Sequence, residues 1–406
     1  MKRVVVTGMG CITSLGQDWA QVKIRLQQGR NAIRFMPEWE CYDGLFTKLA
    51  GPVEFDKPAH YSRKATRTMG RVALMSVRAT ELALEAAGLQ EDPVLGSGQA
   101  GIACGSSTGS TAAIADFSNM LLHGSTQGLN ATTYIRMMSH TTAVNIAVHF
   151  GIKGRVYTTS SACTSSSQGI GYGYEAIRYG SQTIMLCGGA EELCPTEAAV
   201  FDTLFATSTK NDTPELTPCP FDEERDGLVI GEGACMLVLE ELEHAQARGA
   251  TIYAEIIGYG TNCDGAHVTQ PCVDSISKVL QLSLDDAGIA ASDVDYISAH
   301  GTATERGDIA ESHAVLNVLG DQTPLSALKS YTGHTLGACG ATEAWATIMM
   351  MQDGWFHPTL NLRTVDPKCA SIDYITGNGR QLDCDIAMSN NFAFGGINTS
   401  LIFKRI

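Results

Sequence analysis

One cysteine, Cys163, stands in a setting that suits a nucleophile, since TTSSACTSSSQGIGYG surrounds it with small hydroxyl, Ala and Gly residues. None of the 13 cysteines forms a C-x-x-C pair, so the spacing indicates neither a metal nor a disulfide site. Strand-like sequence precedes Cys163 and helix-compatible sequence follows it. We therefore expect the thiol at or just inside a helix N-terminus, where free amides and the helix dipole lower a thiol pKa. Such a thiolate is a candidate acyl acceptor; the alternative is a buried structural thiol.

Two histidines lie in glycine-rich turns after apolar, strand-like sequence: His300 in ISAHGTATERGD and His334 in SYTGHTLGACGATEAW. In α/β sheets the ligand cleft forms at the carboxyl ends of strands, which favours a functional role over a structural or surface one. Lys329 precedes His334 by five residues. Taken alone, this lysine would be a solvated residue at a strand end.

Several chemistries combine a cysteine with histidines. Zinc sites need close ligand pairs such as C-x-x-C or H-x-x-x-H, which the sequence lacks. A cysteine hydrolase needs one base and an orienting Asn or Asp, which leaves the second histidine and Lys329 without a role. Two neutral imidazoles aimed at one developing negative oxygen instead suit an enolate formed by decarboxylation.

The elements that must position these residues are those of an α/β protein. Apolar runs predict strands over residues 2–10, 99–107, 183–191 and 234–241, and apolar residues spaced by three and four predict a helix over 71–89. Strands of this apolar density indicate a sheet that helices cover on both faces.

The second half of the chain repeats the order of the first. VVVTGMG, GIACGSSTGS and VYTTSSACTSSSQGIGYGYEAIRYG correspond to ATIYAEIIGYG, VDYISAHGTAT and LSALKSYTGHTLGACGATEAWATIMM. This pattern predicts two copies of one supersecondary unit, with Cys163 and His334 at related positions near helix starts. No linker separates the copies, so we expect them to pack tightly together.

Composition excludes several classes of protein. With 44% hydrophobic and 17% charged residues in 406, the chain is typical of a compact enzyme. No apolar run is long enough to span a bilayer, no export signal is visible, and the cysteines are typical of a reducing compartment, so we expect a cytosolic protein away from membranes. A net charge of −15 argues against nucleic acid as a partner.

Taken together, these motifs resemble those of the β-ketoacyl-[acyl-carrier-protein] synthase I/II family, which are thiolase-fold condensing enzymes. The resemblance runs from VVVTGMG through SSAC, GGAEE, PFDEERDGLVIGEGACMLVLEELEHAQARGA, AHGTATERGD and LKSYTGHTLGACGATE to SNNFAFGGINTSL. It implies a duplicated, five-layered α/β/α/β/α architecture. Residues 1–249 would form the half with the nucleophile, and 250–406 the half with the histidines and the lysine.

The resemblance also implies the roles of the residues. Cys163 would accept the acyl group from a carrier protein as a thioester, and His300 and His334 would assist decarboxylation of a malonyl thioester. Lys329 would tune the charge of the site and orient the malonyl carboxylate or a histidine. Phe394 would gate the acyl and malonyl sites, and its backbone amide and that of Cys163 would form an oxyanion hole.

Further residues would bind substrate or brace the site. Thr302 and Thr304 would hydrogen-bond the phosphopantetheine arm, which arrives on the carrier protein, so that no organic cofactor or catalytic metal is needed. The resemblance further implies substrate contacts at Phe392, Glu197 and Phe201. Asp308, Glu311 and Glu343 would support the site.

Members of the family can hold a monovalent cation near the site. The matching residues are Ser298, Glu343, Ser389 and Asn390. Ser298 stands where the family usually has Asn, a departure that weighs against the ion. Glu343 is either a ligand of that cation or a buried, hydrogen-bonded structural carboxylate.

Glu197, in ELCPTEAAVF, stands where relatives that bind saturated acyl chains have Met. A carboxylate against a plain alkyl chain costs several kcal/mol if it is unpaired, so Glu197 must be exposed, protonated, paired or in contact with something polar. One hypothesis is an unusual acyl group, polyunsaturated or with a polar aryl end. The alternative is a side chain turned toward solvent or a dimer interface.

A basic cluster in HYSRKATRTMGR is a candidate landing site for an acidic carrier protein. It contains Arg63, Lys64, Arg67 and Arg71, at spacings that put most of them on one helical face. A solvated basic face is the alternative. The second basic stretch of relatives reads LLHGSTQGLN here and has no Lys or Arg.

The resemblance implies a dimer, and three other interpretations of the chain stand beside it. A ketosynthase of a type II polyketide or polyene pathway would pair with a Cys-less chain-length partner as a heterodimer. A non-catalytic scaffold subunit usually lacks the nucleophile, whereas this chain keeps Cys163, His300, His334 and Lys329. A thiolase would use a second cysteine near the C-terminal glycine motif, which reads NFAFGGIN here.

Overall fold

The four predicted strands and the predicted helix are all present in the computed structural model, which describes residues 1–406. The strands are β1 (Val4–Thr13), β4 (Ala100–Gly105), β6 (Ile184–Glu191) and β8 (Gly233–Glu241). The helix is α3 (Arg71–Ala87), which ends at Gly88 in the left-handed conformation. These predictions are confirmed.

The remaining elements fall into a first set before residue 250 and a second set after it. The first set is α1 (Trp19–Gln27), β2 (Arg34–Phe35), β3 (Leu49–Gly51), α2 (Arg63–Thr66), α4 (Thr111–His123), α5 (Ala131–Met137), α6 (Thr141–Phe150), β5 (Val156–Thr158), α7 (Ser165–Arg178), α8 (Pro195–Asp202), β7 (Ile230–Gly231) and α9 (Leu242–Ala247). The second set is β9 (Ala254–Cys263), α10 (Val273–Ala287), β10 (Tyr296–Ser298), α11 (Glu305–Leu319), β11 (Leu325–Ser326), α12 (Lys329–Thr332), α13 (Cys339–Asp353), β12 (Trp355–Phe356), β13 (Arg380–Gln381), β14 (Ile386–Phe392) and β15 (Ile397–Lys404).

The strand order shows the predicted duplication directly. Ten strands form one hydrogen-bonded sheet in the order β5-β4-β6-β8-β1-β9-β15-β14-β10-β11. In the first half, counted from the centre of the sheet outward, β1 pairs with β8 and β8 pairs with β6, both antiparallel. The next two pairs, β6 with β4 and β4 with β5, are parallel. The sequence β9, β15, β14, β10 and β11 repeats these orientations. Each half is therefore one copy of the same five-stranded unit.

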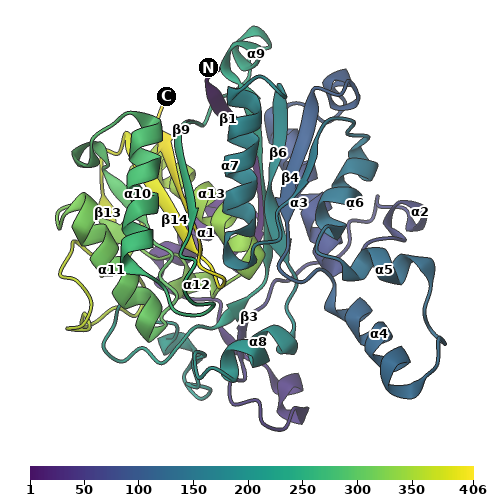
Figure 1. The fold of residues 1–406 in the computed structure, drawn as a ribbon, viewed down its shortest axis with the longest axis horizontal. Coiled ribbons are helices and arrows are strands. Elements are labelled where there is room, and N and C mark those ends of the chain that lie inside the picture. The colour runs from purple at the N-terminus through teal and green to yellow at the C-terminus, as the bar shows by residue number, and fades with distance from the viewer.

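Helices and sheet halves alternate in five layers (Figure 1). The helices α7 and α13 lie in the middle and contact strands of both halves. On the outside, α3 and α6 cover the first half, and α10 and α11 cover the second. The predicted five-layered α/β architecture is confirmed. The predicted boundary at residue 249 falls between α9 and β9 and stays a prediction.

Paired glycines explain how the outer helices approach the central strands. A side chain on Gly8 of β1 would meet the Ala83 carbonyl of α3 at 2.2 Å, and one on Gly258 of β9 would meet the Ser283 carbonyl of α10 at 2.4 Å. Only glycine permits such close contact between a strand and a helix backbone. The two halves use the same device, which is why VTGMG and IIGYG recur in the sequence.

Two small sheets lie apart from the ten-stranded sheet. The strands β2, β3 and β7 form a small separate sheet, and β12 and β13 form a hairpin. Backbone hydrogen bonds hold β7 beside the turn that contains His334. The His334 amide donates to the Val229 carbonyl, and the Gly231 amide donates to the His334 carbonyl. None of the helices is both long enough and apolar enough to cross a bilayer.

Candidate active site

Cys163 lies in a tight turn at the start of a buried helix. The turn is a 3-10 segment, Ala162–Thr164, followed directly by α7. Ala162 has a φ of 51°, and Leu336 in the equivalent turn before α13 has a φ of 43°. The structural counterpart of Cys163 is thus Gly337. His334 lies three residues before Gly337. The prediction that Cys163 and His334 occupy related positions is therefore right about the two turns, but the residue equivalent to Cys163 is Gly337.

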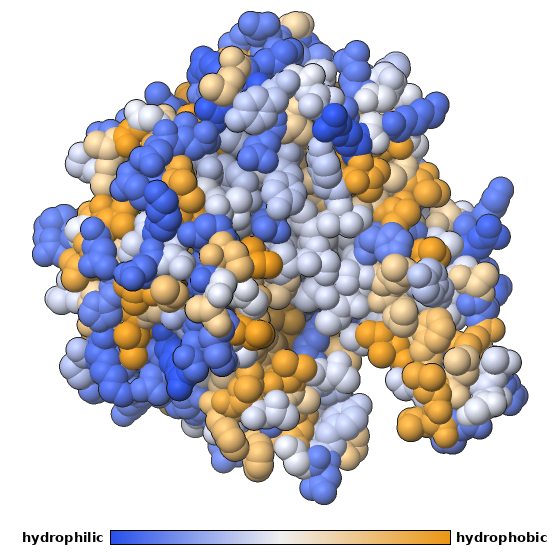
Figure 2. Space-filling model, viewed as in Figure 1, coloured by the Kyte–Doolittle hydropathy of each residue, from blue (hydrophilic) through white to orange (hydrophobic).

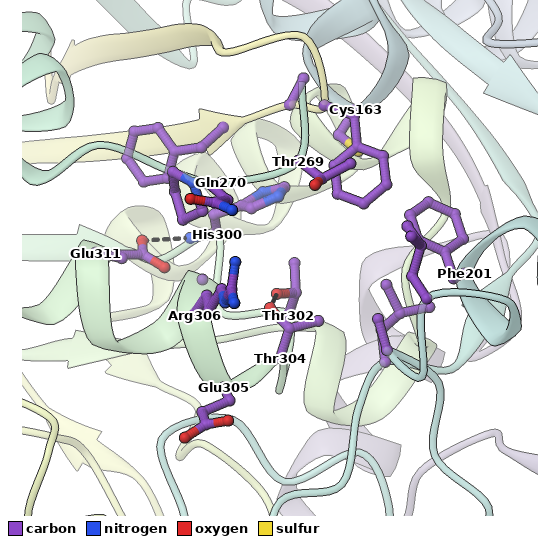
Figure 3. Close-up of a pocket in the computed structure, with 18 of the residues that line it drawn as sticks. Cys163, Phe201, Thr269, Gln270, His300, Thr302, Thr304, Glu305, Arg306 and Glu311 are labelled. Carbon is purple, nitrogen blue, oxygen red and sulfur yellow. Dashed lines mark hydrogen bonds between the residues drawn. The ribbon is translucent and has the colours of Figure 1, made fainter. Parts of the chain in front are cut away.

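A cavity of about 540 Å³ leads to this turn (Figure 3). Cys163, His300 and His334 line it and are nearly inaccessible to solvent, with at most 6% of each residue exposed. Glu305 and Arg306 at the start of α11 also line it and are exposed. The cavity therefore connects solvent with the cysteine and the two histidines.

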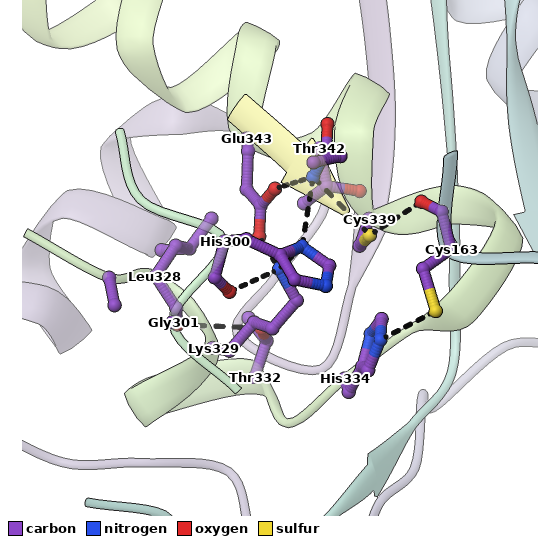
Figure 4. Close-up of polar contacts among 12 residues, drawn as sticks. Cys163, His300, Gly301, Leu328, Lys329, Thr332, His334, Cys339, Thr342 and Glu343 are labelled. Atoms are coloured by element: carbon purple, nitrogen blue, oxygen red, sulfur yellow. Dashed lines mark hydrogen bonds and ion pairs between the residues drawn. The ribbon is translucent and has the colours of Figure 1, made fainter. Parts of the chain in front are cut away.

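The sulfur and the two imidazoles converge (Figure 4). Nε2 of His334 lies 3.1 Å from Sγ of Cys163. The rings of His300 and His334 are 5.2 Å apart between centroids and nearly perpendicular, at 87°. Each of the three residues offers one atom within 4.8 Å of the others. Residues from both halves of the chain thus share one reaction volume.

Hydrogen bonds determine which ring nitrogens carry a proton. Nδ1 of His334 accepts from the Leu336 amide at 3.2 Å. Nδ1 of His300 faces two donors, Lys329 Nζ at 3.1 Å and Asn391 Nδ2 at 3.3 Å. Burial, and after it the charge of Lys329, lowers the pKa of both histidines well below the usual range. Both rings are therefore neutral and present an Nε2–H donor to the cavity.

The same hydrogen bonds bear on metal binding. A histidine binds a metal ion through an unprotonated nitrogen, and its other nitrogen then donates to the surroundings. Here Nδ1 of His300 faces the Lys329 ammonium group and Nδ1 of His334 faces the Leu336 amide, and both of these groups are donors. Nδ1 must therefore accept in each ring, and Nε2 keeps the proton. The residues do not fit a metal centre, and the expectation of no catalytic metal stays a prediction.

Lys329 is buried rather than solvated, with 1% of the residue exposed. Nζ donates to the His300 carbonyl at 2.7 Å and forms an ion pair with Glu343. Burial lowers the pKa of Lys329, but Cys339 and Glu343 outweigh it and raise that pKa above its usual value. The lysine keeps its charge and orients His300. The alternative of a solvated strand end is wrong.

The four residues of the expected cation site divide into two groups. Glu343 is engaged, since one oxygen pairs with Lys329 and the other accepts from Asn391 Nδ2 at 2.7 Å. The Ser389 hydroxyl and both polar atoms of the Asn390 side chain are buried without a partner, and Ser298 is buried beside them on β10. Neutral oxygens therefore fit a monovalent cation, but the one carboxylate is committed to Lys329. The cation stays a prediction.

Two buried carboxylates hold the turn after β10. Glu311 accepts from the amides of His300 and Gly301 at 2.7 and 2.8 Å, and burial raises the pKa of Glu311 to about 8. Asp308 accepts from the amides of Phe221 and Ala303, and burial raises its pKa to about 6. These bonds fix the position of His300 through its backbone.

Threonine and phenylalanine side chains line the rest of the cavity. The hydroxyls of Thr302 and Thr304 lie 2.9 Å apart. The ring of Phe394 packs on Phe201 with centroids 5.0 Å apart, and Phe392 packs against His300 at 5.8 Å. The Phe394 and Phe201 pair thus closes the space beside Cys163.

The expected lowering of the Cys163 pKa is wrong for this structure. Burial raises the pKa of the Cys163 thiol to about 11, although Lys329 and the backbone amides of Phe394 and Cys163 act in the opposite direction. The helix start favours an anion, but loss of solvation at the buried sulfur outweighs it. The resting enzyme therefore holds a thiol rather than a thiolate.

A pH dependence follows from this pKa. Below about 11 the thiolate fraction rises about tenfold per pH unit, so alkylation of Cys163 by iodoacetamide should accelerate steadily between about pH 7 and about pH 9. Mass spectrometry of the Cys163 peptide measures the rate. Lys329→Met should slow the reaction at each pH because the cation that stabilises the thiolate is gone. A rate that levels off near pH 7 would contradict the raised pKa.

Glu197 is buried, with 4% of the residue exposed within a single chain. The predicted alternative of a carboxylate turned toward solvent is wrong, and no dimer interface is needed to bury it. Burial, and after it the neighbouring Glu191, raises the pKa of Glu197 well above the usual range. Of the options open from the sequence, contact with something polar is confirmed, since the Thr108 hydroxyl lies 2.8 Å from Oε1. The raised pKa favours the protonated form.

The basic cluster is smaller than its sequence spacing indicates. Arg63 and Lys64 on α2, and Arg67 just after it, are exposed. Arg71 begins α3 and is half-buried, and its charge is committed to an ion pair with the buried Glu232. Three residues remain available to a partner.

Three residues near the site were not singled out from the sequence. Asn391 bonds both Glu343 and His300, Cys339 Sγ donates to the Cys163 carbonyl at 3.2 Å, and Glu191 accepts from the Gly337 amide at 2.9 Å. Each lies inside a quoted motif, SNNFAFGG, GACGATE or GGAEE. The motifs were the available signal, but only the packing assigns these contacts.

Comparisons with known proteins agree with this geometry. Family models for the beta-ketoacyl synthase N-terminal and C-terminal domains match residues 1–245 and 253–363. The 3-oxoacyl-[acyl-carrier-protein] synthase 1 of Haemophilus influenzae is 36% identical over 413 residues, covering 100% of this chain and 99% of the relative. A beta-ketoacyl synthase structure from Burkholderia phymatum STM815 is 56% identical, with a TM-score of 0.99 and full coverage of both chains.

Two further structures come from assemblies. The ishigamide ketosynthase/chain length factor has a TM-score of 0.91 and 35% identity, covering 100% of this chain and 99% of that one. A type II PKS acyl-carrier protein in complex with its ketosynthase, bound to the hexaketide, has a TM-score of 0.89 and 30% identity over the whole of both chains. The chain described here belongs to the β-ketoacyl-[acyl-carrier-protein] synthase I/II family and is an acyltransferase of that family.

Proposed function

We propose that Cys163, His300, His334 and Lys329 carry out the condensation in this cavity. First, Sγ of Cys163 attacks the carbonyl of an acyl thioester on a carrier protein. The carrier thiol leaves with the thiol proton, and the acyl group stays on Cys163. The neighbouring Nε2–H of His334, 3.1 Å from the sulfur, and the charge of Lys329 support the thiolate as it forms.

A malonyl thioester then enters beside the acylated cysteine. The bond to its carboxylate breaks, carbon dioxide leaves, and the electron pair becomes an enolate. Two neutral Nε2–H donors, from His300 and His334, point at the position of the enolate oxygen. Donors held in a buried site stabilise such a charge without having to reorganise.

The enolate carbon next attacks the acyl carbonyl on Cys163. The amides of Phe394 and Cys163, which lie against the sulfur, are placed to hold the oxygen of the tetrahedral intermediate. The Cys163 thiolate leaves, and the chain, longer by two carbons, stays on the incoming carrier. The observation that supports this proposal most is the convergence of the sulfur with two neutral imidazoles.

The test follows both half-reactions. Incubation with an acyl-carrier thioester should add one acyl group to the Cys163 peptide, seen by mass spectrometry. Malonyl-carrier protein should then release one carbon dioxide per acyl group consumed. An enzyme that condenses without ever carrying an acyl group on Cys163 would contradict the proposal.

The exposed residues Arg63, Lys64 and Arg67 are proposed to dock an acidic carrier protein on a chain of net charge −15. The double variant Arg63→Glu/Lys64→Glu should raise the KM for the carrier thioester about tenfold, since opposite charges steer association. Turnover of a small acyl thioester without a carrier should not change.

The exposed Lys404 at the end of β15 supplies the matched control for this docking surface. Lys404→Glu should leave the KM for the carrier thioester unchanged. Equal effects of Lys404→Glu and of the double variant would mean that overall charge, and not the docking surface, is responsible.

A dimer is proposed along the open edge of the sheet. The edge strand β5 pairs with β4 alone, and 44% of Val156 is exposed. Figure 2 shows apolar side chains gathered over α4, where Leu121 and Leu122 are each 77% exposed. An edge strand and an apolar surface of this kind usually face a partner. Light scattering of the purified chain should give twice the monomer mass; a monomer would contradict this.

A ketosynthase of a type II polyketide pathway is the second candidate function. It is favoured by the buried acid Glu197 and by the similarity to the ishigamide ketosynthase/chain length factor. In that case a homologous Cys-less chain would occupy the β5 edge in place of a second copy. Co-purification of such a chain decides between a homodimer and a heterodimer. The expected cytosolic location stays a prediction.

A further inference from the structure

A carboxylic acid with one unused oxygen lies inside the protein at α8. Glu197 Oε1 accepts from the Thr108 hydroxyl at 2.8 Å. The other oxygen, Oε2, is buried and has no hydrogen-bond partner. Buried polar atoms almost always have partners, so an unpaired one on the helix face that also carries Phe201, a residue lining the cavity, indicates a ligand that supplies the bond.

The neighbours of Glu197 show where its proton is. Glu191 is fully engaged, accepting from the Ser106 hydroxyl at 2.6 Å and from the amides of Ser107 and Gly337 at 2.7 and 2.9 Å. The Thr108 hydroxyl lies closer to Glu197, at 2.8 Å, than to Glu191, at 3.3 Å. With Thr108 as the donor to Glu197 Oε1, the proton of the neutral acid is on Oε2, the oxygen without a partner. Oε2 is a free donor.

The acyl chain has one direction in which to extend from Cys163. The malonyl thioester must enter through the cavity past Thr302 and Thr304, so a chain on Cys163 cannot occupy that space. The chain must pass the Phe201 and Phe394 rings, which lie 5.0 Å apart beside the cysteine. Phe201 belongs to α8, so the chain runs against this helix.

The buried face of α8 contains Glu197, Ala198, Phe201 and Asp202. Glu197 lies four residues before Phe201 and therefore on the same side of the helix. Ala198 packs in one apolar cluster with Cys163. Asp202 is already bonded to the Thr47 amide at 3.2 Å and to the Thr207 hydroxyl at 2.6 Å. Glu197 is thus the one group on this face with a hydrogen-bonding atom to spare.

We propose that Glu197 determines acyl specificity, and that its Oε2 hydroxyl donates a hydrogen bond to an oxygen on the acyl chain. The substrate class is an acyl thioester with a carbonyl or hydroxyl group beyond the thioester carbon. A plain alkyl chain leaves the donor unpaired, and a polyene offers only a π face, which is a weak acceptor. This inference rests on the proposed function, because the chain must be held on Cys163.

The test compares matched carrier thioesters of equal length. Octanoyl chains with an oxo group on the fifth or the seventh carbon are set against octanoyl itself and against a polyene of the same length. The native enzyme should prefer one oxo chain by about tenfold in kcat/KM, a typical effect of one hydrogen bond to an otherwise unpaired buried donor.

Three variants then locate the effect. Glu197→Leu should abolish the preference, raising kcat/KM for octanoyl and lowering it for the oxo chain. Glu197→Gln keeps a donor of similar shape and should retain most of the preference. Val200→Ala changes an exposed position of the same helix and should change nothing. Thermal melting of each variant shows which ones fold, and Glu197→Gln keeps the test valid if Glu197→Leu does not.

Three outcomes would overturn the inference. One is equal turnover of octanoyl and oxo chains by the native enzyme, and another is an unchanged ratio in Glu197→Leu. Preference for the polyene would assign an unsaturated chain instead. If no acyl thioester of any kind adds to Cys163, the proposed function fails, and this result is distinct from the other three.

Discussion

Cys163→Ala is expected to lower condensation by roughly 10⁴-fold or more, since removal of a nucleophile leaves only binding and charge stabilisation. Release of carbon dioxide from malonyl-carrier protein should continue in the same variant. The reason is geometric: the two Nε2–H donors belong to His300 and His334, and their hydrogen bonds to Lys329 and Leu336 do not depend on the cysteine.

Product analysis by mass spectrometry and capture of labelled carbon dioxide measure the two reactions separately. Cys41→Ala is the matched control, since Cys41 is an exposed cysteine on another segment and should leave both rates unchanged. If decarboxylation disappears together with condensation in Cys163→Ala, the two halves of the site do not act separately. If condensation survives, the thiol is not the acyl acceptor.

His300→Ala is expected to have the opposite effect. Acylation of Cys163 should continue, whereas decarboxylation should fall by about 10² to 10³-fold, the usual loss on removing one donor to an oxyanion. His300 lies beside His334 and reaches the cavity, but the direct contact with the sulfur, at 3.1 Å, is made by His334. His334→Ala should therefore slow both half-reactions.

The stoichiometry of acyl adduct on Cys163 and the rate of carbon dioxide release distinguish these variants. His300→Asn keeps a donor and should restore part of the decarboxylation. His313→Gln is the control, because His313 lies on α11, does not line the cavity and hydrogen-bonds the Lys368 carbonyl. Loss of acylation in His300→Ala would mean that His300 acts on the cysteine rather than on the malonyl group.

Lys329 connects these predictions. Its charge lowers the pKa of both histidines and acts against the raised pKa of Cys163. Burial is the larger cause of the neutral imidazoles, and this one cation adds to it while also favouring the thiolate. Its ion pair with Glu343, whose other oxygen accepts from Asn391, balances that charge in the interior, since an unpaired buried cation would be strongly destabilising.

The sequence was sufficient for the plan of the molecule and for the main reactive residues. Apolar periodicity located β1, β4, β6, β8 and α3, because these elements are local and their burial imposes a regular pattern. The repeated motifs predicted the duplicated sheet. The residue types in the turns at Cys163, His300 and His334 indicated a thiol and two imidazoles.

The charge states required the tertiary structure. Cys163 was expected to have a lowered pKa from its helix start alone, but burial by both halves of the chain raises it to about 11. Glu197 was open to several interpretations, and only the packing of α8 shows a buried, neutral acid. Arg71 resembled its exposed neighbours in sequence but pairs with Glu232, 161 residues away.

The physical reason is the same in these cases. The type of a side chain and its local conformation are written in a few neighbouring residues, whereas desolvation and ion pairing depend on partners far away in sequence. The sulfur of Cys163 and the ring of His334 are 171 residues apart and meet only because the two halves fold against each other. The sequence alone therefore determined which groups can react, and the fold determined which of them are charged.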